Sequence, residues 1–154
     1  MIGYAVSSPV PLYDDAVSLA AISLRDRLAE ATAPGTSVAV TPATMLRDAL
    51  IAAIRIPATD GDVMPSPEVV RRAFMFARSI PVDASRPEIV IESDGEIAFD
   101  WDYGRRRVLS VSIGEGPMLR FATLIGAEPV SGRVPYAGVF PQTVAYFLRR
   151  LGPA

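Results

Sequence analysis

The spacing of apolar residues changes at Pro81, and this change limits the fold more than any other feature of the sequence. Before Pro81, apolar residues recur about every three to four positions, as on one face of a helix. After Pro81 they alternate with polar residues, and glycine-bearing turns interrupt the runs, as in strands joined by hairpins. The sequence therefore predicts an α+β domain whose sheet is an antiparallel meander. The predicted strands are 88–92, 96–103, 107–113 and 118–125, and 129–134 can add a short fifth strand.

The predicted helices begin where a capping side chain precedes the helical spacing. Asp14 or Asp15 caps the first, over 14–31, and a last helix follows Pro141. Thr41-Pro42 and Ser66-Pro67 each place a hydroxyl before a proline at the first helical position. We expect a helical N-terminal segment over 1–57 and a meander domain over 66–154, with helices on one face of the sheet. The two parts should form one compact unit.

The alternating runs also predict how the strands pair. Apolar side chains of neighbouring strands share one face only if each hairpin loop has an odd number of residues. Ser93-Asp94-Gly95 suits a three-residue loop, with Gly95 in the left-handed conformation that ends such a turn. This register turns one apolar set inward, against helix 67–80 and the C-terminal helix. The set includes Phe99, Trp101, Val111 and Phe121.

The composition excludes several classes of chemistry. Cysteine, histidine and lysine are absent, so thiol catalysis, histidine general bases and lysine Schiff bases cannot operate. All 15 basic residues are arginine, as a GC-rich bacterial genome would encode. The net charge of −2 gives no overall attraction to nucleic acid or anionic lipid. No signal-peptide pattern or membrane-spanning run is present, so we expect a cytoplasmic protein without cofactor, metal or catalytic residues.

The second face of the predicted sheet collects carboxylates. From residue 88 to residue 102 the chain has six acidic residues and no basic one. Like charges on neighbouring strands destabilise a sheet. Their accumulation indicates either a solvated outer surface or a docking surface for a basic partner protein. Asp100 and Asp102 should both point to solvent. The candidate partner-binding residues are Glu88, Glu92, Glu96, Asp100 and Asp102.

Two groups of charged residues have a second interpretation. Asp100 and Asp102 stand about 6–7 Å apart on one strand face, so they could share Mg²⁺ or Mn²⁺ in a hydrolase or nuclease. No glycine-rich loop or basic catalytic residue accompanies them. Arg105, Arg106 and Arg107 follow the second strand in a turn, where they either pair with nearby acids or contact phosphate.

The N-terminal helices carry more apolar residues than one sheet-facing side requires. Leu19, Ile22 and Ile51 lie beside the main apolar stripes. These side chains are either buried on a second side within the domain or form an association surface, including one between copies of the chain.

Short motifs follow one another in a recognisable order from Pro65 onward. Ser66-Pro67-Glu68 opens an arginine-containing helix, and Pro87-Glu88-Ile89 opens the sheet. The remaining motifs are DGEIAFDW over 94–101, RRVLSVS over 106–112, Phe121-Ala122, Gly132 and Pro135-Tyr136. In these residues the chain resembles a group of small uncharacterised bacterial proteins. The resemblance implies an α+β fold and a bacterial setting, and it implies no catalytic residues because the group has no assigned activity.

Taken together, the residues predict a non-enzymatic module that binds another protein. An antitoxin, an immunity protein or an anti-defence (anti-CRISPR-like) inhibitor would dock a basic partner through the acidic sheet face. The alternatives are a metal-dependent hydrolase or nuclease that uses Asp100 and Asp102, and a nucleic-acid-binding regulator that uses the arginine-containing turn. The poor catalytic inventory and the small size favour the protein-binding module.

Overall fold

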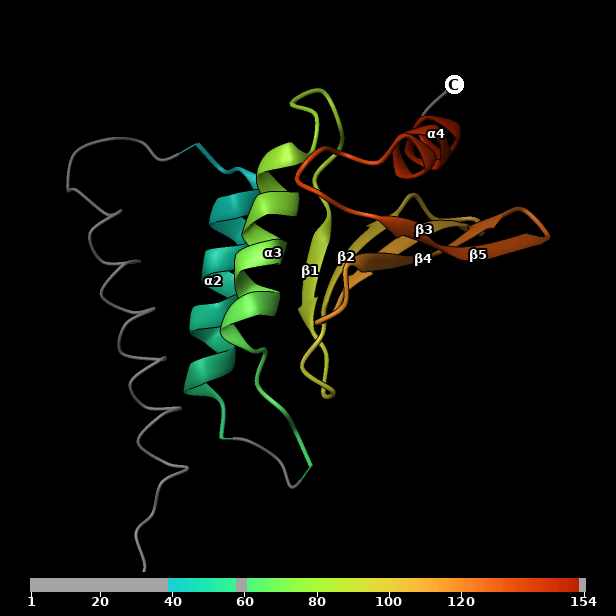
Figure 1. Ribbon diagram of the computed structural model, residues 1–154. Coiled ribbons are helices and arrows are strands. Elements are labelled where there is room, and N and C mark those ends of the chain that lie inside the picture. Colours follow the sequence, from blue (N-terminus) through green and yellow to red (C-terminus); the bar gives the residue numbers. More distant parts are fainter. Residues whose placement is uncertain (1–38, 58–60, 153–154) are drawn as a thin grey trace, which may run out of the picture. The chain divides into compact units, whose positions relative to one another are not determined.

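The computed structural model describes residues 39–57 and 61–152 (Figure 1). These residues belong to one compact unit, which begins at Ser37 and contains the helix after Thr41 as well as the sheet. The helix predicted over 14–31 lies outside the described residues, and so do Leu19 and Ile22.

The described chain has the predicted α+β architecture. Its strands are hydrogen-bonded in chain order and every neighbouring pair is antiparallel, so the meander is confirmed, with five strands. The helices are α2 (Pro42–Arg55), α3 (Pro67–Ser79) and α4 (Gln142–Leu151). The strands are β1 (Glu88–Ile91), β2 (Ile97–Asp102), β3 (Arg107–Ile113), β4 (Met118–Ile125) and β5 (Glu128–Pro135).

Helices α2 and α3 begin at the predicted caps. The Thr41 hydroxyl accepts the N–H of Thr44 at 3.2 Å, and the Thr44 hydroxyl accepts the N–H of Thr41 at 2.8 Å. The Ser66 hydroxyl accepts the N–H of Val69 at 3.3 Å. A proline follows each cap, at a position where a helix needs no backbone donor. Each cap contributes about 1 kcal/mol and fixes where its helix begins.

The inner face of the sheet packs against α3 and α4. Phe76 of α3 lies edge-on to Phe99 of β2, with ring centroids 5.0 Å apart, and Phe147 of α4 covers Phe121 of β4 at 5.5 Å. Figure 1 shows α2 beside α3, and α4 over β3 and β4. The predicted inward set is confirmed, because its members are all buried: Phe99, Trp101, Val111 and Phe121.

Two buried polar side chains tie loops to this core. Trp101 donates its indole N–H to the carbonyl of Ser85 at 2.8 Å, which satisfies its one polar group. The guanidinium of Arg72, on α3, donates through Nη1 to the carbonyls of Gly114 and Gly116 in the β3–β4 loop. The helices and the inner face are therefore joined by polar as well as apolar contacts. We call the opposite face of the sheet the outer face.

Candidate functional site

The outer face of the sheet gathers the predicted acidic residues over β1, β2 and the loop between them. Glu88 stands directly opposite Asp100, and the Glu92 N–H donates to the carbonyl of Glu96 at 2.9 Å across the hairpin. Like charges that face each other across a strand pair destabilise a sheet by roughly 0.2–1 kcal/mol per pair. We call this surface the acidic face. It consists of Glu88, Glu92, Asp94, Glu96, Asp100 and Asp102.

Residues 92–96 separate β1 from β2, and they hold a cluster of three carboxylates. The hydrogen bond from Glu92 to Glu96 closes a three-residue loop, 93–95, as predicted. Gly95 has a φ of 83°, and Asp94 accepts the N–H of Glu96 through Oδ1 at 3.0 Å. Glu92, Asp94 and Glu96 each offer a carboxylate oxygen, and these oxygens lie within 4.8 Å of one another. Such an oxygen cluster has the chemistry to hold a hard cation. Neither Asp100 nor Asp102 belongs to it.

Glu92 is the acid most affected by this crowding. Partial burial raises the pKa of its carboxyl above the ordinary 4.5, and the charges of Asp94 and Glu96 raise the pKa further. Arg120 acts in the opposite direction. Because the ionised carboxylate is disfavoured in this environment, a cation brought to the loop would stabilise it.

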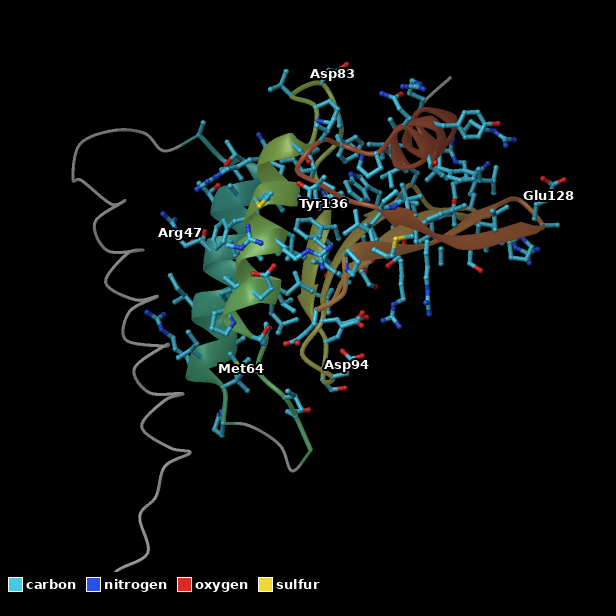
Figure 2. All side chains as sticks on the ribbon, viewed as in Figure 1. Arg47, Met64, Asp83, Asp94, Glu128 and Tyr136 are labelled. Carbon is cyan, nitrogen blue, oxygen red and sulfur yellow. The ribbon has the colours of Figure 1, made fainter. Side chains whose placement is uncertain are left out.

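The loop is held in place by the segment that precedes α3. The Val63 N–H donates to the Ser93 carbonyl at 2.8 Å. A Cβ added to Gly95 would lie 3.3 Å from both the Met64 carbonyl oxygen and a Val63 methyl carbon, so the two backbones are in close approach. Figure 2 shows Asp94 at the tip of this hairpin, with Glu128 at the opposite end of the sheet. The acidic cluster therefore sits on a fixed loop.

The structure corrects the prediction that Asp100 and Asp102 both point freely to solvent. Asp102 is exposed, and its Oδ1 accepts the N–H of Gly104 at 2.6 Å. Asp100 is half-buried, and its Oδ1 is closed off from solvent without a hydrogen-bond partner among the described residues. The reason is position: Asp100 lies between Glu88 and Ser110 on the two flanking strands, whereas Asp102 lies where β2 ends.

One arginine from a distant strand reaches the acidic face. Arg120 of β4 forms an ion pair with Glu96. Over residues 39–57 and 61–152, it is the only cation that forms an ion pair with this face. Arg120 itself stands opposite Arg133 of β5, so like charges also meet at the other side of the sheet. The outer face is thus acidic along β1 and β2 and basic along β4 and β5.

A shallow hollow of about 570 Å³ lies between these two charged sides. Small side chains form its floor, because Ser110, Ser112, Ala122 and Ser131 project from the central and last strands. Gly132 stands directly opposite Phe121 and adds only backbone to the hollow, because the ring of Phe121 on the inner face occupies the space where a Cβ would be. The charged residues along the rim are Glu92, Asp94, Arg120 and Arg133.

The loop between β2 and β3, residues 104–106, contains two of the three predicted arginines, and we call it the arginine turn. Arg107 is the first residue of β3, as the predicted strand 107–113 has it, and so lies outside the turn. The reason is that its carbonyl accepts the N–H of Tyr103 at 2.9 Å, which closes a three-residue loop, and Arg107 pairs with Ile125 of β4. Gly104, Arg105 and Arg106 have φ values of 66°, 46° and 61°.

Arg105 and Arg106 are exposed. None of the three arginines forms an ion pair within the part of the chain that the structure describes. Pairing with nearby acids therefore does not explain why the turn carries guanidinium groups.

The predicted association surface is described only at Ile51, which is half-buried on α2. Leu19 and Ile22 lie outside the described residues, so this surface stays a prediction.

No helix within the described ranges is long and apolar enough to cross a membrane. No protein-family model, curated protein or solved structure matches the chain. The resemblance to small bacterial proteins therefore stays a prediction, and the function has to be inferred from the outer face of the sheet.

Proposed function

We propose that this chain is a non-enzymatic binding module that docks a basic surface of another protein on its acidic face. The observation that carries the proposal is the gathering of six carboxylates between Glu88 and Asp102, of which one is paired with an arginine among the described residues. The module would act as an inhibitor of its partner, in the manner of an antitoxin, an immunity protein or an anti-defence protein. Covering a basic nucleic-acid-binding surface is the simplest way for an acidic face to inhibit.

The carboxylates of the unbound acidic face repel one another, and docking of a basic partner would relieve this repulsion. Glu88 opposes Asp100, and Glu92 is partly buried beside two other carboxylates, so each of these groups is destabilised by its neighbours. A partner that supplies arginine or lysine would replace this repulsion with charge-assisted hydrogen bonds. The association rate should fall steeply with added salt, because salt screens the attraction between exposed charges.

Charge reversal tests the proposal. Glu88→Arg combined with Asp102→Arg changes two exposed positions of the face and leaves the buried side of the sheet untouched. The matched control combines Glu115→Arg with Glu128→Arg, which changes the net charge equally at exposed positions outside the face. Each protein is immobilised and used to capture partners from cells of its source at about 50 and 300 mM salt. Captured proteins are identified by mass spectrometry and then purified.

The wild type and the control should capture the same basic protein at low salt, and the reversed variant should lose it. With the purified partner, reversal should weaken binding by at least about tenfold, mainly through slower association. Equal affinity for the wild type and the reversed variant would show that the acidic face is only solvated.

The competing function is a metal-dependent hydrolase or nuclease centred on Asp100 and Asp102. If these residues held a catalytic cation, Mg²⁺ or Mn²⁺ would raise the melting temperature of the wild type and not that of Asp100→Ala. We expect the same response in both proteins. A shift that depends on Asp100 would favour the enzyme.

A further inference from the structure

The arginine turn has a backbone that suits other residues better than arginine. The left-handed conformation costs a residue with a Cβ roughly 1–2 kcal/mol, and glycine or asparagine is the usual occupant. Arg105 and Arg106 both adopt it, directly after Gly104, which already does. Backbone strain of this kind persists where the side chain has a use. No ion pair within the described residues accounts for either guanidinium.

The backbone of the turn is also held by several hydrogen bonds. The N–H of Arg107 donates to the Gly104 carbonyl at 3.0 Å, and the N–H of Gly126, in the neighbouring hairpin, donates to the Arg106 carbonyl at 2.9 Å. Asp102 caps the turn by accepting the N–H of Gly104. A loop held at this many points presents its side chains with little loss of backbone entropy on binding.

The hollow on the outer face has the complementary chemistry. Glu92 and Asp94 provide carboxylates that no arginine pairs with in the described part of the chain, and the serine hydroxyls of the floor can accept hydrogen bonds. Guanidinium is a planar group with only donors, which matches the acceptors on the Glu92 and Asp94 side of the hollow. At the other side of the rim, Arg133 is free of ion pairs within the described residues and would match a carboxylate.

We propose that a second copy of this chain inserts its arginine turn into the hollow. The turn carries two exposed arginines, and Asp102 lies three residues before the first of them. The hollow carries two carboxylates and Arg133 without ion pairs among the described residues, together with Arg120, which is paired with Glu96. The arginines of the turn would therefore meet carboxylates of the hollow, and Asp102 would meet Arg133, so the charges across the contact are opposite in sign. One copy cannot fill its own hollow, because loop 93–95 and the arginine turn lie at opposite ends of the six-residue strand β2, about 20 Å apart.

This contact regulates the surface used in the proposed function. A second copy that occupies the hollow covers Glu92 and Asp94, so self-association would compete with docking of a basic partner. The self-association itself needs no outside partner and is measured with the purified chain alone. Of the residues it uses, the charge-reversal test of the docking face changes only Asp102, and Arg105, Arg106, Glu92 and Asp94 stay in place. Failure of one proposal therefore leaves the other standing.

Sedimentation velocity of the purified full chain tests the contact. At about 20 mM salt the sedimentation coefficient of the wild type should rise with protein concentration, and at about 500 mM salt it should stay at the monomer value. Arg105→Glu with Arg106→Glu should lower the association constant by at least about tenfold. The matched control, Arg149→Glu with Arg150→Glu, makes the same charge change on the exposed side of α4 and should associate like the wild type.

A charge-swap mixture separates this contact from general charge effects. The first variant is Arg105→Glu with Arg106→Glu, and the second is Glu92→Arg with Asp94→Arg. Each variant alone should stay monomeric, because its turn and its hollow then have the same sign. An equimolar mixture should associate, because each turn again meets a hollow of opposite sign. Circular dichroism checks that both variants fold. If the second variant does not fold, Glu92→Gln with Asp94→Asn takes its place in the test for loss of association.

Three results would overturn the proposal. The wild type could remain monomeric at low salt, the turn variant could associate as strongly as the wild type, or the mixture of two folded variants could remain monomeric. A fourth result would assign the turn to a different ligand. If the wild type is monomeric and retains a DNA duplex that Arg105→Glu with Arg106→Glu releases, the turn binds phosphate and not a second copy.

Discussion

Neighbouring residues of strand β2 lie in opposite environments. Phe99 and Trp101 are buried against helices, whereas Asp100 and Asp102 stand on the outer face among other carboxylates. On the inner face close packing determines the free energy of unfolding, and a lost side chain leaves a cavity. On the outer face the side chains repel one another and water screens the repulsion. The two faces of one sheet therefore differ in kind: packing on the inner face sets stability, and the outer face carries the repelling charges on which the proposed docking rests.

Truncation on the inner face should give the largest effect. Trp101→Ala or Phe99→Ala removes a fully buried ring and should lower the free energy of unfolding by about 3–5 kcal/mol. Glu88→Ala, on the same hairpin but exposed, should change it by less than about 0.5 kcal/mol. Urea denaturation of the three variants measures the difference. Similar losses for Trp101→Ala and Glu88→Ala would contradict the division between the faces.

The hairpin loops should give the next largest effect. Gly95 and Gly126 both have positive φ, but a Cβ at Gly95 meets the Met64 carbonyl and Val63, whereas none lies within 4 Å at Gly126. Gly126→Ala should therefore cost about 1 kcal/mol from the left-handed backbone alone. Gly95→Ala should cost about 2 kcal/mol, because crowding adds to the same strain. Equal losses in thermal unfolding would show that the segment before α3 does not hold the loop.

The inner face and the strand register were predictable because they depend on local rules. Alternation of apolar residues determines which side of a strand is buried, and the odd loop length follows from aligning those sides. Glycine at Gly95 indicated the left-handed end of a three-residue loop, which the structure has. The same rule predicted a strand over 107–113, which β3 matches, with Trp101 directly opposite Leu109.

The rest of the candidate site depends on contacts between residues far apart in the sequence. The ion pair of Arg120 with Glu96 joins β4 to the end of β2, and the hydrogen bond of Val63 to Ser93 involves a segment without periodicity. The hollow needs small residues on three neighbouring strands, which become adjacent only after the strands pair. Nothing in Gly104-Arg105-Arg106 indicates that the arginines would take the conformation of glycine.

A glycine substitution in the arginine turn should have a smaller effect on the free energy of unfolding, and it should raise that free energy. Arg106→Gly relieves a left-handed residue and should raise the free energy of unfolding by up to about 1 kcal/mol, less the extra entropy of glycine in the unfolded chain. The same change should weaken self-association, because one guanidinium is lost. Stability and association would then move in opposite directions in one variant. A loss of stability in urea would show that the Arg106 side chain supports the fold itself.

The smallest effect should come from Glu92, and its sign depends on pH. Because the folded chain raises the pKa of this carboxyl, the folded state binds the proton more readily than the unfolded state. The cost of ionised Glu92 is therefore fully present above the raised pKa and disappears as the pH falls below the ordinary 4.5. Glu92→Gln, which cannot ionise, should melt at a higher temperature than the wild type at about pH 7, and the gap should close near about pH 3.

Glu115→Gln removes the same charge from the exposed β3–β4 loop, and it serves as the control for net charge. At about pH 3 protonation has removed the charge of Glu92 from the wild type. If the difference in melting temperature between Glu92→Gln and the wild type persisted unchanged at that pH, lost or gained contacts would be its cause. If Glu115→Gln produced an equal gap at about pH 7, the repulsion would belong to the net charge of the chain. Only a gap that is specific to Glu92 and closes with acid locates the electrostatic cost in the loop between β1 and β2, where a cationic group from a partner or a second copy would relieve it.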